Sequence, residues 1–235
     1  MKRFRKEEII IIPMKIKAVI FDMDGVIFDS EILVLKSWKE VAAKNGFTIE
    51  DELFYKCVGV NAVNTKEIFL DYYGRDFPYD EYKAQASKWF HDRYDNGLLP
   101  MKPGVRELLT YLKEAGYLIG LASSTREVTV TREIGDAHLL PFFDNLTCGD
   151  MLNKSKPEPD IFWMACDNLQ VKPEEALVIE DSFNGIRAAY SAGCIPVMVP
   201  DMIAPDEEMR EKAFAIFHNL SEVKEWMETQ VSNET

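Results

Sequence analysis

Four short segments of the chain contain the residue types that transfer phosphoryl groups. Each one follows an apolar run or precedes a helical pattern. They are Asp22-Met23-Asp24, Ser123-Ser124-Thr125, Lys156-Pro157 and Glu180-Asp181. Taken singly, each has an ordinary explanation as a turn, a helix cap or a solvated lysine. Their joint occurrence at successive strand ends favours one site, because the carboxyl ends of parallel strands meet at the same edge of a sheet.

The carboxylates of this set predict a magnesium site and a nucleophile. Clustered carboxylates repel one another, and a hard divalent cation with oxygen ligands offsets that repulsion. Asp22 can attack a phosphoryl group to form an aspartyl-phosphate, while Lys156 and the metal neutralise the developing charge. Asp24 lies on the same side as Asp22 if the chain is still extended there, and it can then act as general acid and base.

The order of apolar runs and helical patterns predicts an α/β core with a Rossmann-like, doubly wound parallel sheet. From residue 103 onward, apolar runs alternate with amphipathic segments, which is typical of a parallel sheet with helices on both faces. Strands are expected at residues 15–21, 117–122, 145–148, 176–179, 195–199 and 213–217. Helices are expected at residues 104–115, 126–134, 159–169, 182–192 and 221–228.

The segment between the first strand and residue 100 has a different pattern. Helical spacing recurs there without a convincing strand, which predicts an inserted all-helical cap domain over residues 31–99. The core domain is then expected at residues 1–30 and 100–235. Residues 1–13 are expected to be an extension or an added edge strand. The helices expected in the cap cover residues 31–44, 66–73 and 79–94.

Composition excludes several classes of partner. The net charge of −13 argues against nucleic acid and anionic membranes, which would repel the chain. The four cysteines and three histidines are scattered and form no zinc pattern, so we expect buried, reduced thiols. The apolar run Ile9–Ile12 is too short for a signal peptide and is broken by Pro13. We therefore expect a cytoplasmic protein that is a monomer or a weak dimer.

Taken in order, the four segments resemble the motifs of the haloacid dehalogenase superfamily. The resemblance spans residues 15–199, and the helical insertion lies where that family carries its small cap. It implies a magnesium-dependent enzyme with a Rossmann-like core that acts on a small phosphorylated metabolite. The matching segments are Asp22-Met23-Asp24-Gly25-Val26, Leu121-Ala122-Ser123-Ser124, Lys156-Pro157-Glu158-Pro159-Asp160 and Val178-Ile179-Glu180-Asp181-Ser182.

Carried over by position, the resemblance assigns a role to each motif residue. It makes Asp22 the nucleophile and Asp24 the general acid and base. It implies that Ser123 and Lys156 bind the transferring phosphate. The magnesium ligands that it implies are Asp22, the main-chain carbonyl of Asp24, Asp181 and, directly or indirectly, Glu180.

Within the superfamily, the chain is most similar to the β-phosphoglucomutase-like subgroup of sugar-phosphate phosphatases and mutases. The mutases carry a histidine on the helix after the first motif, and an arginine after Gly-Val-Ser in the cap. Here the helix reads Glu31–Lys36 without a histidine, and the cap reads Gly59–Ala62 without an arginine. We therefore expect a phosphatase for a sugar or polyol phosphate, with a phosphomutase as the alternative.

Two alternative hypotheses for the function of these residues remain open. Phosphonate-cleaving members of the superfamily form a Schiff base with a cap lysine, for which Lys56 and Lys66 are candidates. A non-catalytic phospho-receiver is a remote alternative, because receivers lack an extra domain that selects substrate. The residues expected to contact substrate are Lys56 and Asn61 in the cap, and Ser124 and Arg126 after the second strand.

Overall fold

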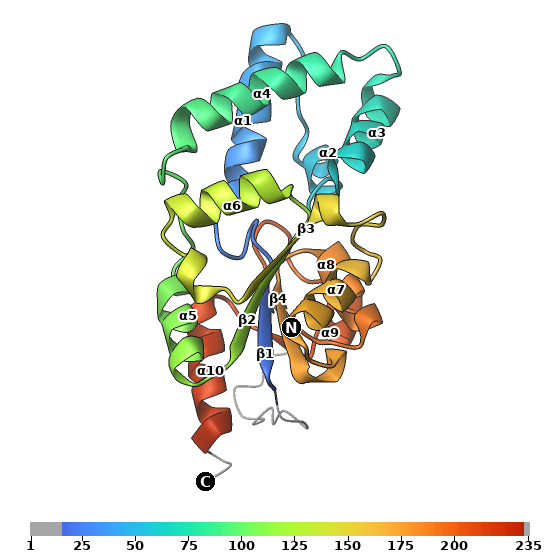
Figure 1. The fold of residues 1–235 in the computed structure, drawn as a ribbon. Coiled ribbons are helices and arrows are strands. Elements are labelled where there is room, and N and C mark those ends of the chain that lie inside the picture. Colours follow the sequence, from blue (N-terminus) through green and yellow to red (C-terminus); the bar gives the residue numbers. More distant parts are fainter. Residues whose placement is uncertain (1–15, 233–235) are drawn as a thin grey trace.

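A parallel six-stranded sheet forms the centre of the protein (Figure 1). This computed structural model describes residues 16–232. The strand order is β3-β2-β1-β4-β5-β6, and every neighbouring pair is parallel. The order reverses at β1, so the carboxyl end of β1 lies at the crevice where open α/β sheets bind ligands. The strands are β1 (Ala18–Phe21), β2 (Leu118–Ser123), β3 (Asn145–Cys148), β4 (Ala176–Glu180), β5 (Ile195–Met198) and β6 (Ala215–Ile216).

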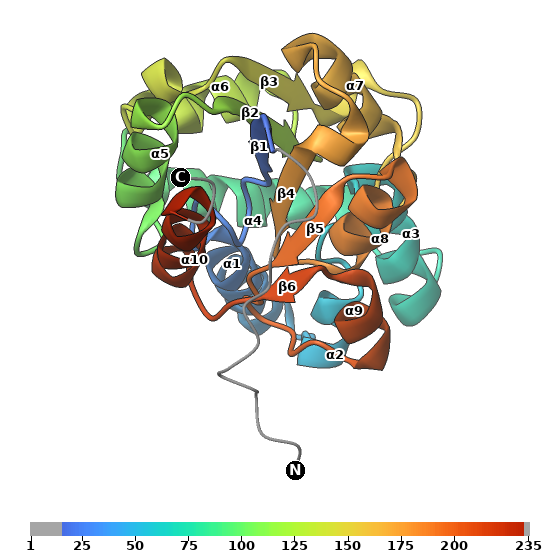
Figure 2. The same ribbon diagram turned by 90° about the horizontal axis from the view of Figure 1, so that it is seen from below.

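Helices cover both faces of the sheet (Figure 2). Along β1, Val19 and Phe21 belong to the apolar core that includes residues of α5, α6 and α10. Ala18 and Ile20 belong to the second core, with residues of α7 and α8. This alternation is the two-residue period of a strand that is buried on both faces. The helices of this part are α5 (Val105–Glu114), α6 (Glu127–Asp136), α7 (Asp160–Leu169), α8 (Phe183–Ala192), α9 (Glu207–Lys212) and α10 (Leu220–Ser232).

Four further helices lie beyond the carboxyl end of the sheet (Figure 1). They enclose an aromatic core of their own, in which the ring of Trp38 lies 4.5 Å from that of Phe69 and 5.6 Å from that of Tyr79, between centroids. No strand interrupts them within the described residues. They are α1 (Ser30–Asn45), α2 (Asp51–Tyr55), α3 (Ala62–Tyr73) and α4 (Tyr79–Tyr94).

Two adjacent chain segments connect this helical layer to the sheet. The Asp29 N–H donates to the Pro100 carbonyl at 2.9 Å, and the Lys102 N–H donates to the Ile27 carbonyl at 2.8 Å. The Lys102 ammonium also donates to Asp29 Oδ1 at 2.9 Å and to the carboxylate of Asp201. Because the ammonium is partly buried between the two carboxylates, it ties both connections to the loop after β5.

The expected α/β class and the inserted helices are confirmed. The expected strand at residues 213–217 shortens to Ala215–Ile216, and the patterns missed α2 and α9. These two helices have five and six residues, which is too short to show a helical period. The expectation for residues 1–13 lies outside the described part of the chain. None of the described helices is long and apolar enough to cross a membrane.

Candidate active site

The predicted nucleophile lies at the central position of the sheet edge. Asp22 follows β1 directly, and its N–H donates to the Ile179 carbonyl of β4 at 2.9 Å. Because β1 is hydrogen-bonded to both β2 and β4, the residues that end those strands flank Asp22. Asp22 is 6% exposed, and Glu180 is fully buried. The strand ends therefore converge as the sequence predicts.

Lys156 joins the strand ends through a buried ammonium group. Its Nζ donates to Asp22 Oδ1 at 2.5 Å, to Glu180 Oε1 at 2.6 Å and to the Ala122 carbonyl at 3.0 Å. Three acceptors use all the donors of a lysine ammonium. Burial acts to lower the pKa of Lys156, but the adjacent carboxylates outweigh it and hold that pKa above its usual range. Lys156 is thus a fixed positive charge in contact with the predicted nucleophile.

Glu180 positions Lys156 and the start of α8. Its Oε2 accepts from the N–H groups of Asp181 and Ser182 at 3.1 Å each, and from the Ser182 hydroxyl at 3.0 Å. The Ser182 Oγ in turn accepts from the Gly185 N–H at 3.0 Å and caps α8. A side chain at Gly185 would meet this carboxylate, because a Cβ there would lie 1.9 Å from Glu180 Oε1. Both Glu180 oxygens are therefore already occupied by protein donors.

The carboxyl groups of Asp22, Glu180 and Asp181 fit a divalent cation. One oxygen from each lies within 4.8 Å of the others, and all three residues are buried. Burial first, and then the neighbouring carboxylates, raise the pKa of Asp22 to about 8 against the opposing charge of Lys156. The same two causes raise the pKa of Asp181 well above its usual range. One ammonium cannot balance three carboxylates, so oxygen donors of this type and number suit Mg²⁺.

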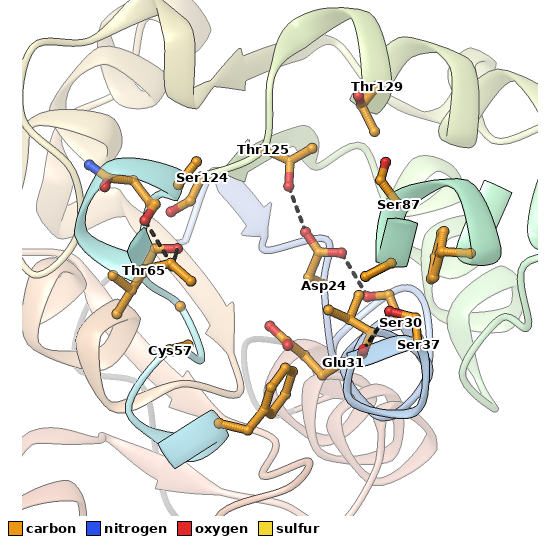
Figure 3. Close-up of a pocket in the computed structure, with 18 of the residues that line it drawn as sticks. Asp24, Ser30, Glu31, Ser37, Cys57, Thr65, Ser87, Ser124, Thr125 and Thr129 are labelled. Carbon is orange, nitrogen blue, oxygen red and sulfur yellow. Dashed lines mark hydrogen bonds between the residues drawn. The ribbon is translucent and has the colours of Figure 1, made fainter. Parts of the chain in front are cut away.

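The carboxylate of Asp24 points to a different set of partners. Its two oxygens accept from the Ser30 hydroxyl at 2.6 Å and from the Thr125 hydroxyl at 2.9 Å (Figure 3). Asp24 lies outside the carboxyl cluster, which leaves only its main-chain carbonyl for the magnesium role that the resemblance implies. Both Asp22 and Asp24 line the same cavity. Asp24 lies in a turn, because the Ile27 and Phe28 N–H groups both donate to the Met23 carbonyl.

The two serines after β2 lie in different surroundings. Ser123 is fully buried, and its Oγ accepts from the Thr125 N–H at 3.1 Å. Ser124 and Arg126 line the cavity, whereas Ser123 is not among its lining residues. The position of the Ser123 hydroxyl therefore suits holding the loop in shape, and Ser124 is the serine that lines the cavity.

A cavity of about 590 Å³ lies between the sheet edge and the helical layer. Its volume suits a small metabolite. On the cap side it is lined by Gly59–Asn61, where a Cβ at Gly59 would lie 2.6 Å from Ser182 Oγ. Asn61 caps α3 and donates from Nδ2 to Ser155 Oγ at 2.9 Å, so it connects the cap to the loop that carries Lys156.

The two cap lysines singled out from the sequence, Lys56 and Lys66, do not line this cavity. Lys56 is exposed and absent from its lining residues, so the expected substrate contact is not present in this structure. Lys66 forms an ion pair with Asp80 at 2.5 Å on the surface. Neither lysine is placed for a Schiff base with a ligand in the cavity.

Several residues of the site were not predicted from the sequence, among them Ser30, Glu31 and Glu133. Ser30 holds Asp24, and Glu31 and Glu133 line the cavity. The sequence carries only a weak signal for Ser30, a hydroxyl at the start of a helix. Glu133 is separated from Asp24 by more than a hundred residues, and only the packing of α6 across the sheet edge brings it to the cavity.

Comparison with known proteins identifies the family. The sequence profile described as Haloacid dehalogenase-like hydrolase matches residues 19–199. The chain therefore belongs to the haloacid dehalogenase-like hydrolases, and it is an enzyme of that type. Its similarity to the sugar-phosphate phosphatases and β-phosphoglucomutases of the family is also confirmed.

The individual relatives cover nearly the whole chain. A phosphorylated carbohydrates phosphatase from Thermotoga maritima is 29% identical over 90% of this chain and 90% of its own length. A β-phosphoglucomutase from Bacillus subtilis is 30% identical over 92% of this chain and 97% of its own. The crystal structure of CbbY from Rhodobacter sphaeroides in complex with phosphate superposes with a TM-score of 0.74 at 25% identity. It covers 88% of this chain and 96% of the other.

Proposed function

We propose that this enzyme hydrolyses a phosphate monoester of a sugar or polyol through an aspartyl-phosphate on Asp22, with Mg²⁺ as its cofactor. The observation that carries the proposal is the buried cluster in which Asp22 contacts Lys156 beneath the cavity. A carboxylate with a fixed ammonium beside it, at the carboxyl end of the central strand, is arranged for attack on a phosphoryl group. The names of the relatives support a phosphorylated carbohydrate as substrate.

In this proposal Asp22 must be ionised to attack. The charges of the neighbouring groups determine its protonation state. Asp22 Oδ1 is bound by Lys156, and Oδ2 is the oxygen left to attack phosphorus. Bound Mg²⁺ would supply positive charge to keep the cluster ionised and to neutralise the phosphoryl oxygens. Its ligands would be Asp22 and Asp181, together with the main-chain carbonyl of Asp24, while Glu180 supports them through Lys156 and the start of α8.

Asp24 is the group proposed to move protons. As an acid it protonates the leaving oxygen of the ester, and as a base it takes a proton from the water that attacks the aspartyl-phosphate. The hydroxyls of Ser30 and Thr125 fix both carboxyl oxygens and orient the group toward the cavity. Proton transfer in both half-reactions by one fixed carboxyl explains why a second acid lies two residues after the nucleophile.

The test is a screen for phosphate release across sugar, polyol and nucleotide monophosphates, with and without Mg²⁺. We expect magnesium-dependent release from a sugar or polyol phosphate and none from Asp22→Asn. Full activity of Asp22→Asn would refute the mechanism.

A phosphomutase remains the second candidate, because the β-phosphoglucomutase of Bacillus subtilis matches almost the whole chain. Conversion of glucose 1-phosphate to glucose 6-phosphate with a bisphosphate primer, without phosphate release, would favour it over the phosphatase. The sequence favours water as the acceptor, since the histidine and arginine of the mutases are absent.

A further inference from the structure

The cavity contains two carboxyl groups that the proposed mechanism does not use. Glu31 is the second residue of α1 and Glu133 lies near the end of α6, and both line the cavity. Within the described residues, no hydrogen bond or ion pair engages the Glu31 carboxyl. The Glu133 carboxyl has one long contact, at 3.4 Å, with its chain neighbour Arg132. Carboxyls that are partly buried and have so little support from the protein are available to a ligand.

Both groups lie close enough to Asp24 to feel its charge, and they come from different helices, α1 and α6. In Figure 3 the Glu31 carboxyl extends into the cavity next to Asp24, and Thr129 of α6 lies across from it. Glu133 follows Thr129 by one helical turn and so shares its face of α6. Burial raises the pKa of each group, and the Asp24 charge is the largest electrostatic contribution in both cases. Negative charge is therefore unfavourable near Asp24, whichever molecule carries it.

The cations of the cavity do not offset these groups. Lys156 is already bound by Asp22 and Glu180. Lys83 and Arg126 also line the cavity, but within the described residues neither forms an ion pair with Glu31 or Glu133. Arg126 precedes α6, so it is separated from Glu133 by about two helical turns, or roughly 10 Å.

The geometry points to Glu31 and Glu133 as the residues that select the leaving group. They accept the hydroxyls of an uncharged polyol and exclude leaving groups with a second anion near the ester. This inference rests on the proposed function, because Asp24 can protonate the leaving oxygen only from about 3 Å. The carbons attached to that oxygen then lie near the two glutamates. Hydroxyls there find acceptors, whereas a carboxylate or a second phosphate meets the carboxyl groups of Glu31, Glu133 and Asp24.

The inference excludes two kinds of anionic substrate. Phosphoglycolate carries a carboxylate on the ester carbon, and pyrophosphate releases an anion. Both are predicted to be poor substrates here.

The test compares substrates that differ only in charge: glycerol 3-phosphate against 3-phosphoglycerate, and 2-hydroxyethyl phosphate against phosphoglycolate. The assay runs at pH 9, above the pKa of Glu133. We expect wild type to favour the neutral member of each pair by about 100-fold in kcat/KM, which corresponds to about 2.7 kcal/mol. The double variant Glu31→Gln/Glu133→Gln, which keeps the shape of both side chains, should reduce this ratio at least tenfold. Glu40→Gln, on the exposed face of α1, is the matched control and should leave the ratio unchanged.

Two results would overturn the inference: a wild type that prefers the anionic member, or a double variant with an unchanged ratio. Failure of the proposed function looks different, because wild type would then release phosphate from neither pair nor from para-nitrophenyl phosphate. A further readout is Glu31→Ala, which should lower kcat/KM for glycerol 3-phosphate more than for ethyl phosphate, a substrate without hydroxyls. Equal loss on both would contradict hydroxyl recognition by Glu31.

Discussion

Replacement of Gly185 by alanine tests how the site is held together without touching any proposed catalytic group. Gly185 lies in the first turn of α8 and its φ is not in the left-handed region, so alanine can adopt the backbone conformation. On helix propensity alone the change would stabilise the protein by up to about 1 kcal/mol. The structure predicts the opposite sign, because the new Cβ would lie 1.9 Å from the Glu180 carboxyl carbon and 2.2 Å from Oε2.

The expected loss of stability follows from the hydrogen bonds and the ion pair that Glu180 would lose. Non-bonded carbon contacts are made at about 3.5–4 Å, so the carboxylate has to retreat by more than about 1 Å. The bond from Lys156 at 2.6 Å and the bonds from the start of α8 at about 3.1 Å are then lost or stretched. Breaking a buried ion pair costs about 3–5 kcal/mol. Lys156 keeps Asp22, so we expect the low end, and a net loss of about 2 kcal/mol after the gain in helix propensity.

Urea unfolding of the metal-free protein measures the stability, and magnesium-dependent phosphate release measures the activity. Activity should fall roughly 100-fold, as it does when one preorganised electrostatic group is misplaced. The matched control is Gly135→Ala in α6, where the nearest atom to a new Cβ is Leu140 Cδ1 at 3.3 Å. That variant should be fully active and at least as stable as wild type. Equal stability and activity of the two variants would refute the role given to Glu180.

Three further predictions follow from other parts of the site. Thr125→Val removes one hydrogen bond to Asp24 and should lower kcat about fivefold, the equivalent of about 1 kcal/mol, with KM nearly unchanged; an unaltered kcat would remove Thr125 from the positioning of Asp24. Mg²⁺ at 100 times its Kd should stabilise the protein by about 2.7 kcal/mol in thermal unfolding, and Asp181→Asn should abolish most of that gain; an equal gain in the variant would place the metal elsewhere. Burial, and then the Asp24 charge, raise the pKa of Glu133 from 4.5 to about 8, so the folded wild type loses stability as pH rises across that window. The free energy of unfolding of Glu133→Gln should therefore rise relative to wild type between about pH 5 and pH 8 and stay level above pH 8. A difference that is constant across this range would contradict the raised pKa.

The sequence was sufficient to predict what depends on local pattern. Asp22, Ser123 and Glu180 end apolar runs, and parallel strands bring such ends together, so their convergence could be expected. The cap helices followed from helical spacing without strand signals. What the sequence could not supply was the direction of side chains at the sheet edge. Burial of the Ser123 hydroxyl, with Ser124 facing the cavity, depends on how the loop after β2 turns.

The sequence also could not predict which residues tertiary packing brings to the cavity. Glu133 reaches the cavity only because α6 packs across the sheet edge. Lys56 fails to reach it because its side chain is exposed, although the next residue, Cys57, lines the cavity. In a sequence, a charged residue that lines a cavity cannot be told from one that faces solvent, because the difference depends on how the helices are oriented relative to one another. The roles of the motif residues remain proposals, supported by a geometry that places Lys156 against Asp22 and two hydroxyls against Asp24.

The most direct measurement of the central claim is detection of the phosphorylated enzyme. Acid quenching during turnover, followed by peptide mass spectrometry, should find one phosphoryl group on the peptide that contains Asp22. The Asp24→Asn variant should turn over more slowly than wild type, because Asp24 is proposed to move a proton in both half-reactions. In Asp22→Asn the modification should be absent. A wild type that turns over substrate with no phosphorylated peptide, or a phosphoryl group on another residue that persists in Asp22→Asn, would contradict the account.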